Sequence, residues 1–380
     1  MRRTHLRPPD LAAFSTDYFE ARARFLEAAR RAGGLLATYT HPERGPGQRE
    51  LATDVARFGP RDATDALLLI CGTHGVEGLP GSACLLDWLA GHMPATRPTD
   101  MAAVLVHALN PYGVAWRQRQ TEDNVDLNRN CRDFAATNSG ASPLYDEFHD
   151  ALVRAQPGTA AWTAASAELD AARTRQGDAA YYAAIMAGQS AHADGLFYSG
   201  AQPTWSHRTL RTIMADHVPA VARLAIVDFH TGLGAYGCGV LGAADRPGSG
   251  SLERARIWFG PGTVRPIHAL IDARAGTPAP MQLLGDLGSG LQAALPATTI
   301  TSVALEYGTY EVERFLEAYR ANCWMQRHGS RTDAVGQQIA AAFEAFFYPR
   351  SADWQELILA RARQVTRQAT AGLKREGMTR

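Results

Sequence analysis

The sequence predicts an α/β fold in which parallel strands are connected by helices. Four short apolar runs supply the strands, at residues 66–72, 102–110, 224–230 and 301–308. Continuous apolar runs that stop at polar or glycine-rich turns are typical of strands covered on both faces. A helical pattern at 81–93 lies between the first two runs, so these three segments predict a β–α–β unit with a parallel crossover.

The remaining segments predict one domain with insertions. Residues 15–33 have apolar positions at helical spacing, capping residues at the start and Gly33–Gly34 at the end, so they predict a helix. Residues 140–195 are rich in alanine and predict a helical insertion, whereas 245–290 is rich in glycine and proline and predicts loops near a site. No linker divides the chain, and we expect a single domain over 1–380.

Composition limits the classes of partner. The 380 residues are 46% hydrophobic, and 38 Lys and Arg balance 38 Asp and Glu. No overall charge therefore favours nucleic acid or an anionic membrane. The start of the chain lacks the apolar stretch of a secretion signal, and no run is long enough to span a bilayer, so we expect a cytoplasmic protein. The five cysteines form no C-x-x-C pair, which predicts free thiols.

Polar side chains stand where the predicted strands end. His74 and Glu77 follow the first strand, Asn110 the second, His230 the third, and Glu306 ends the fourth. Ligands of open α/β sheets collect beyond the carboxyl ends of the strands. A shared metal ion would explain this gathering.

Imidazole nitrogens and a carboxylate oxygen are suitable ligands for Zn²⁺, and a catalytic zinc keeps one position open for water. His74, Glu77 and His230 are therefore predicted to bind one zinc ion per chain, although another divalent metal is an open alternative. A single His-x-x-Glu pair is common without any ligand role; the prediction depends on its conjunction with His230 and Glu306.

Competing motifs are weaker. The chain contains no H-E-x-x-H and no G-x-S-x-G, which argues against those hydrolase classes. Residues 232–237 match G-x-G-x-x-G after a strand, but no helix follows that could bind a pyrophosphate. Arginines and asparagines gather in 117–130, where guanidinium groups can bind a carboxylate in a bidentate manner. A solvated charged loop is the alternative for that segment.

Five sequence blocks occur in an order that resembles the zinc carboxypeptidase superfamily: THGVE (73–77), NPYG (110–113), VDLNRN (125–130), DFHTGLG (228–234) and ALEYGT (304–309). Over nearly the full length the chain resembles a little-characterised bacterial branch of unknown function, near the succinylglutamate desuccinylase and aspartoacylase group. The resemblance implies a mixed, largely parallel twisted β-sheet flanked by helices.

The resemblance also implies roles for individual residues. His74, Glu77 and His230 would be the zinc ligands, and Glu306 the general base. Arg119 would stabilise the oxyanion, with Arg117 as the alternative. Asn128 and Arg129 would hold the substrate carboxylate. Asp126 would orient His74.

These roles imply a zinc-dependent hydrolase that cleaves an amide next to a carboxylate-bearing residue of a small peptide. The alternatives are an N-acyl amino acid deacylase of the desuccinylase–aspartoacylase type and a metal-binding module without catalysis. One departure concerns specificity, because no tyrosine lies between Tyr236 and Glu306, where classical carboxypeptidases have a mobile one. Digestive-type exopeptidase specificity is therefore not expected.

Overall fold

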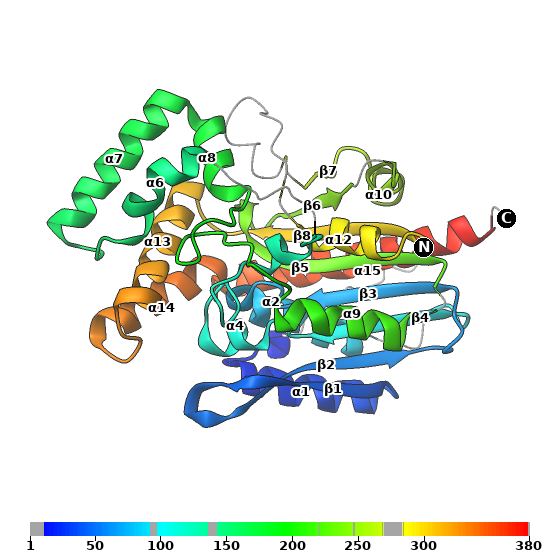
Figure 1. Ribbon diagram of the computed structural model, residues 1–380. Helices are drawn as coiled ribbons and strands as arrows, with labels where there is room; N and C mark the ends of the chain where they lie inside the picture. Colours follow the sequence, from blue (N-terminus) through cyan, green and yellow to red (C-terminus); the bar gives the residue numbers. More distant parts are fainter. Residues whose placement is uncertain are drawn as a thin grey trace.

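A computed structural model of the chain describes residues 11–91, 97–135, 143–219, 221–245, 248–267, 269, 283 and 285–378. The described strands form an eight-stranded sheet in the order β1-β2-β4-β3-β5-β8-β6-β7 (Figure 1). Their bounds are β1 Leu35–Arg44, β2 Glu50–Phe58, β3 Asp65–Cys71, β4 Met101–His107, β5 Arg223–Tyr236, β6 Gly239–Ala244, β7 Val264–Pro266 and β8 Thr299–Gly308.

The middle of the sheet is parallel and its flanks are mixed. β4, β3, β5 and β8 run parallel to one another, whereas β1 pairs with β2, β2 with β4, and β6 with β8 in the antiparallel sense. The predicted α/β class with a mixed, largely parallel sheet is thereby confirmed. The four apolar runs found in the sequence are the four central strands, since buried parallel strands need apolar residues on both faces.

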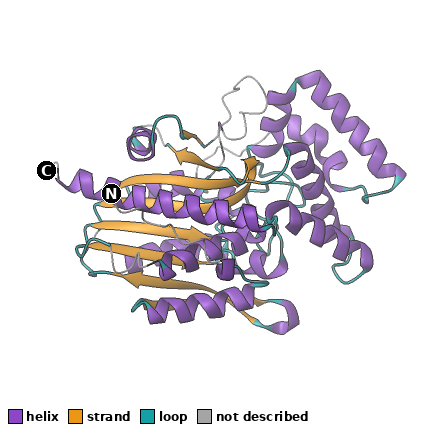
Figure 2. Cartoon of the chain, turned by 180° about the vertical axis from the view of Figure 1, so that it is seen from behind, coloured by secondary structure: helices purple, strands orange, loops and turns teal. Residues whose placement is uncertain are grey.

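Helices cover both faces of the sheet. One face packs against α1 (Tyr18–Arg31), α2 (Gly78–Ala90), α10 (Ser251–Phe259) and α15 (Ala352–Met378) in one apolar cluster. The opposite face packs against α9 (Trp205–His217) and α12 (Leu287–Ala294). Figure 2, seen from behind, shows α15 crossing the sheet on the first of these faces. The predicted first helix is α1, which begins after Asp17 because the Asp17 carboxylate accepts hydrogen bonds from the amides of Phe19 and Glu20.

A separate group of helices lies beyond one end of the sheet, at the left of Figure 1. It comprises α6 (Pro143–Val153), α7 (Ala160–Gln176), α8 (Asp178–Met186), α13 (Val312–His328) and α14 (Ala334–Phe347), which share an aromatic-rich core. The first three fall within the predicted insertion 140–195, of which 140–142 lie outside the described residues. The assignment of 1–380 to a single domain stays a prediction.

The short elements lie mostly in the connections. They are the helices α4 (Pro111–Trp116) and α5 (Leu127–Asn130) and the single turns η1 (Leu11–Ala13), η2 (Pro46–Gln48) and η3 (Gly75–Glu77). The region predicted as loops at 245–290 contains α10, β7 and the start of α12, so the prediction is wrong there, and 246–247, 268, 270–282 and 284 lie outside the described residues. Among the helices that the structure describes, none combines the length and apolar character needed to cross a membrane.

The buried residue His107 should make the stability of the fold depend on pH. The His107 ring stacks on Phe25 and its Nε2 lies 2.9 Å from the Ser82 hydroxyl, and burial lowers the pKa of His107 to about 4. The unfolded chain, with a histidine pKa near 6.5, therefore binds a proton that the folded chain does not bind between pH 6.5 and 4. The free energy of unfolding should therefore decrease by about 3 kcal/mol as the pH is lowered from 6.5 to 4.

Urea unfolding at several pH values between 7 and 4 measures this effect. His107→Gln removes the titrating group, so its free energy of unfolding should decline less steeply with acid than that of the wild type. His328 is exposed, so His328→Gln serves as the control, and its free energy of unfolding should decline with acid as that of the wild type does. Equal slopes for wild type and His107→Gln would contradict the assignment.

Candidate metal centre

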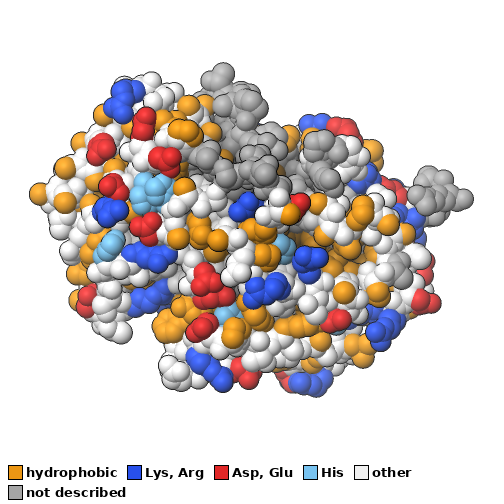
Figure 3. Space-filling view, viewed as in Figure 1, with side chains coloured by type: hydrophobic (Ala, Val, Ile, Leu, Met, Phe, Trp, Pro, Cys, Tyr) orange, Lys and Arg blue, Asp and Glu red, His pale blue; other side chains and the backbone are white. Residues whose placement is uncertain are grey.

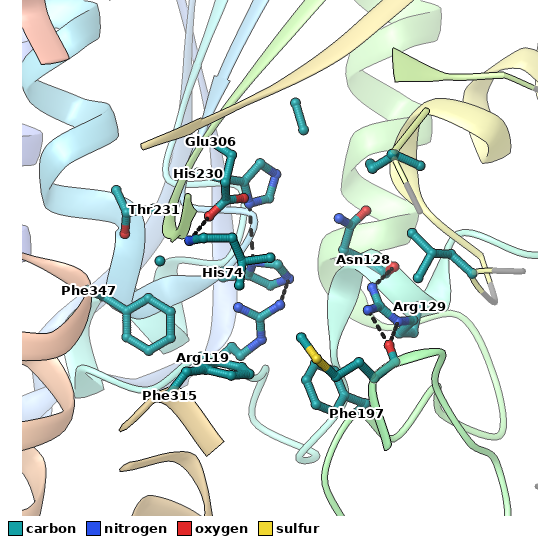
Figure 4. Close-up of a pocket in the computed structure, with 16 residues that line it drawn as sticks. His74, Arg119, Asn128, Arg129, Phe197, His230, Thr231, Glu306, Phe315 and Phe347 are labelled. Carbon is teal, nitrogen blue, oxygen red and sulfur yellow. Dashed lines mark hydrogen bonds between the residues drawn. The ribbon is translucent and has the colours of Figure 1, made fainter. Parts of the chain in front are cut away.

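Side chains from three adjacent strands meet at the carboxyl end of the parallel part of the sheet. His74 and Glu77 follow β3 in the turn η3, while His230 and Glu306 lie on β5 and β8 as direct partners in the strand register. Because β3, β5 and β8 are parallel neighbours, residues far apart in the chain are brought to one edge. Figure 4 shows His74, His230 and Glu306 pointing into the same pocket.

The turn after β3 depends on close backbone contact. A Cβ atom at Gly75 would lie only 2.0 Å from the backbone of Gly113, so that position requires glycine. The Gly75 amide donates to the Arg119 carbonyl at 3.1 Å, and the Val76 amide donates to the Gln118 carbonyl at 2.9 Å. These contacts place the arginine-rich segment directly beside His74 and Glu77.

The three predicted ligands converge through the Nδ1 atoms of the two histidines and the two carboxylate oxygens of Glu77. His74 Nδ1 lies 3.2 Å from His230 Nδ1 and 3.1 Å from Glu77 Oε1, and His230 Nδ1 lies 3.1 Å from Glu77 Oε2. Ligands of a tetrahedral zinc at bond lengths of about 2.1 Å are separated by roughly 3.4 Å. The three residues are at most 3% exposed. The donor set, its spacing and its burial therefore fit a zinc ion.

The far nitrogen of each imidazole contacts a carboxylate. His74 Nε2 lies 3.0 Å from Asp126 Oδ1, and His230 Nε2 lies 2.8 Å from Asp228 Oδ2. The Thr73 hydroxyl lies 2.9 Å from each oxygen of Asp228. The Asp228 contact places a proton on His230 Nε2 and leaves the His230 Nδ1 lone pair free to bind a metal, whereas His74 Nε2 also lies 2.9 Å from Arg119 Nη2. Asp126 is the residue that the resemblance implied as the partner of His74, and its role stays a prediction.

Asp228 was missed by the sequence analysis, although a signal for it exists. It stands two residues before His230 on β5, and residues i and i+2 of a strand point to the same side. An Asp-x-His pair at the carboxyl end of a buried strand therefore predicts that the carboxylate contacts the imidazole nitrogen that faces away from the metal.

The charges of neighbouring side chains favour a positive charge among the three predicted ligands. Burial alone would raise the pKa of Glu77, but His74, His230 and Arg119 together hold it below the usual range. Burial opposes a charged His230, yet Asp228 and Glu77 raise the pKa of His230 well above its ordinary value.

Glu306 differs from the other carboxylates. Its Oε1 accepts a hydrogen bond from the Leu233 amide at 3.0 Å, and the side chain lines the pocket. Burial, followed by the charge of Glu77, raises the pKa of Glu306 to about 7. A carboxylate with a pKa near neutrality can both accept and return a proton at physiological pH.

The structure distinguishes the two candidate arginines. Arg119 lines the pocket, where its Nη1 donates to Glu77 Oε1 at 2.7 Å and its Nε donates to Asp126 Oδ2 at 3.2 Å. Arg117 instead pairs with Glu344 at 3.0 Å, and its side chain is 47% exposed. Arg119 is therefore the arginine beside the predicted metal ligands.

Arg129 is a buried cation in the same pocket and is bound by neutral groups. Its Nη2 donates to the Met186 carbonyl at 2.6 Å and its Nη1 donates to the Asn128 carbonyl at 2.9 Å. Burial is the main cause of its lowered pKa, and the charge of Arg119 adds to it. The Asn128 side chain also lines the pocket, with its Oδ1 held by the Leu287 amide at 2.8 Å. Figure 4 shows Asn128 and Arg129 together across the pocket from His74.

Apolar side chains form the remaining walls, and the sequence analysis did not identify them. Several come from the helical group beyond the sheet or from the segment after α8. They are Met186, Phe197, Leu233, Ile267, Leu283, Phe315 and Phe347. Walls of this kind exclude water and strengthen the polar interactions inside.

Comparison with protein families identifies the group to which the chain belongs. A family model described as "Protein of unknown function (DUF2817)" matches residues 14–361. The chain belongs to the DUF2817 family. The predicted membership of a branch of unknown function is thereby confirmed. No curated protein matched the chain.

Solved structures similar to this DUF2817 chain include carboxypeptidases. Bovine thrombin-activatable fibrinolysis inhibitor, in complex with tick carboxypeptidase inhibitor, is 11% identical over 93% of this chain and 99% of its own, with a TM-score of 0.44. Carboxypeptidase A from Helicoverpa armigera is 14% identical over 86% and 74%, with a TM-score of 0.41. Murein-tripeptide amidase MpaA from Escherichia coli O157 is 16% identical over 88% and 100%, with a TM-score of 0.37.

The carboxylate behind His230 yields a testable prediction for this DUF2817 chain. Asp228→Asn keeps the shape of the side chain but removes the charge that fixes the His230 tautomer, so zinc affinity should fall by about 10–100-fold. Competition with a chromogenic chelator measures the affinity. Asp216→Asn, at an exposed position that contacts Tyr39, is the matched control and should bind like the wild type. Unchanged affinity in Asp228→Asn would show that Asp228 does not support a ligand.

Proposed function

We propose that the chain is a zinc-dependent hydrolase that cleaves an amide bond next to a carboxylate-bearing residue. The observation that carries the proposal is the convergence of His74 Nδ1, Glu77 and His230 Nδ1 within 3.2 Å of one another, with Glu306 on the neighbouring strand. A zinc ion held by these residues would supply a water of lowered pKa and polarise the scissile carbonyl.

The residues of the chain would perform the remaining steps. Glu306 takes the proton from the attacking water and returns it to the leaving amine nitrogen, as its pKa of about 7 permits. Arg119 donates hydrogen bonds to the carbonyl oxygen as negative charge develops there. Arg129 and Asn128 bind the substrate carboxylate and so set the position of the amide.

Two substrate classes satisfy this arrangement, because short peptides and N-acyl amino acids both carry a carboxylate beside the amide. Zinc-loaded protein should be assayed with dipeptides, with N-acyl amino acids and with the C-terminally amidated form of each. The better-hydrolysed class identifies the activity, and the amidated forms should react poorly. Hydrolysis of none of these compounds by zinc-loaded protein would reject the proposed function.

Substitution of Arg129 tests the carboxylate site. Arg129→Met keeps a long apolar side chain but removes the charge-assisted hydrogen bonds, so KM should rise about 10–100-fold for substrates with a free carboxylate. Steady-state kinetics with free and amidated substrates measures this, and the amidated substrates should show no such rise. Arg132→Met is the matched control, since Arg132 donates to the Gly200 carbonyl outside the pocket. An equal change for both substrate forms would refute carboxylate binding by Arg129.

A further inference from the structure

A second cluster of potential metal ligands lies outside the pocket. His149 on α6 and two residues of the segment after α8, His192 and Asp194, each offer one ligand atom, and these atoms all lie within 4.8 Å of one another. His149 Nε2 is 3.2 Å from Asp194 Oδ1, and His192 Nε2 is 2.8 Å from Asp146 Oδ1. In Figure 3 histidine atoms lie next to acidic side chains on the surface over α6.

His149 is the buried member of this cluster. It is 5% exposed, and within the described part of the chain its Nδ1 has no hydrogen-bond partner. A buried polar ring with an unsatisfied nitrogen is costly unless a further partner is supplied.

The arginines near the cluster have hydrogen-bond partners other than its proposed ligands. Arg154 pairs with Asp150 at 2.6 Å, and Arg327 donates to the Ala193 carbonyl at 2.7 Å. Asp194 faces His149 and Asp146 faces His192. Two imidazoles with carboxylates form a donor set that suits zinc and related divalent transition metals.

We propose that His149, His192 and Asp194 bind a second divalent transition metal ion of the zinc class, with Asp146 as the carboxylate partner of His192. The Asp146–His192 contact repeats the Asp126–His74 contact of the first site, in which the far nitrogen faces a carboxylate. The two rings are stacked, with centroids 3.9 Å apart. Sharing an ion requires the His192 ring to turn, and His192 stands in an irregular segment with its side chain 27% exposed.

The ion would fasten the segment after α8 to α6. That segment carries Phe197, whose ring lies 5.6 Å from the Arg119 guanidinium and 5.3 Å from that of Arg129. Gln189 connects His192 to Phe197 within this segment. Its side-chain Nε2 donates to the His192 carbonyl, and its backbone amide donates to the Phe197 carbonyl. A second metal would therefore steady one wall of the pocket. This consequence rests on the proposed function, whereas metal binding itself does not.

Zinc stoichiometry tests the proposal on full-length protein without a histidine tag, by isothermal titration and elemental analysis after dialysis. The wild type should bind two equivalents, His192→Ala one and the exposed control His328→Ala two. His74→Ala should keep the second equivalent. Two equivalents retained in His192→Ala, or no zinc bound by His74→Ala, would overturn the proposal. Zinc that survives His74→Ala but is absent from His74→Ala/His192→Ala would support it even if the proposed hydrolase activity fails.

A second variant guards against loss of folding. Asp194→Asn is nearly isosteric at a side chain that is 44% exposed, so the fold should persist while the second equivalent is lost. Zinc should also raise the Tm of His74→Ala but not that of His74→Ala/Asp194→Asn. The same zinc-induced shift in both proteins would overturn the proposal.

Discussion

Glu306→Gln should reduce hydrolysis by at least about 10²-fold while zinc binding at the first site stays unchanged, because glutamine cannot accept the proton of the attacking water. Glu306 is not one of the three converging ligands, and its Oε1 instead accepts a hydrogen bond from the Leu233 amide. Glutamine can keep that acceptor through its carbonyl oxygen. The substitution thus separates proton transfer from metal binding.

Elemental analysis and steady-state kinetics on the same preparation measure both quantities. Glu317→Gln, at an exposed position on α13, is the matched control and should keep wild-type turnover. Turnover at the wild-type level in Glu306→Gln would reject Glu306 as the general base. Loss of zinc together with activity would instead make Glu306 part of the metal site.

His74→Ala should remove one equivalent of zinc and, with it, all measurable hydrolysis. Only Glu77 and His230 would remain, and two ligands do not make the three-ligand site that catalytic zinc requires. His74 is a better choice than His230 for this test. Its partner Asp126 keeps a salt bridge to Arg119, whereas Asp228 would lose the imidazole contact that it has in the wild type. Asp228 would then be a buried carboxylate held only by the Thr73 hydroxyl, with no positively charged partner among the described residues, which would threaten the fold itself.

Zinc content, activity and thermal unfolding should be compared between His74→Ala and His328→Ala. The control should match the wild type in all three. Full activity in a folded His74→Ala protein would exclude a role for His74 in catalysis.

The gathering of the candidate metal ligands was predictable because these residues mark the ends of strands. His74 and His230 follow apolar runs, and parallel neighbours place such ends at one edge of the sheet. Their convergence therefore followed from strand pattern and chemistry. The choice between Arg117 and Arg119 did not, since both lie in one polar loop and only the fold decides which of them turns inward.

The pocket walls and the outer strands could not be derived in the same way. Phe197, Phe315 and Phe347 come from distant segments, and nothing local distinguishes them from ordinary core residues. β1 is an edge strand in which only His41 is buried, so the alternation that signals a half-buried strand is missing. The cluster of His149 and His192 joins a helix to an irregular segment, and no sequence spacing predicts that contact.

A crystal structure of the zinc-loaded protein, with anomalous diffraction recorded at the zinc absorption edge, tests the central claim most directly. The account predicts an anomalous peak about 2.0–2.2 Å from His74 Nδ1, a Glu77 oxygen and His230 Nδ1. A zinc-loaded crystal with no anomalous peak between these three side chains would contradict it.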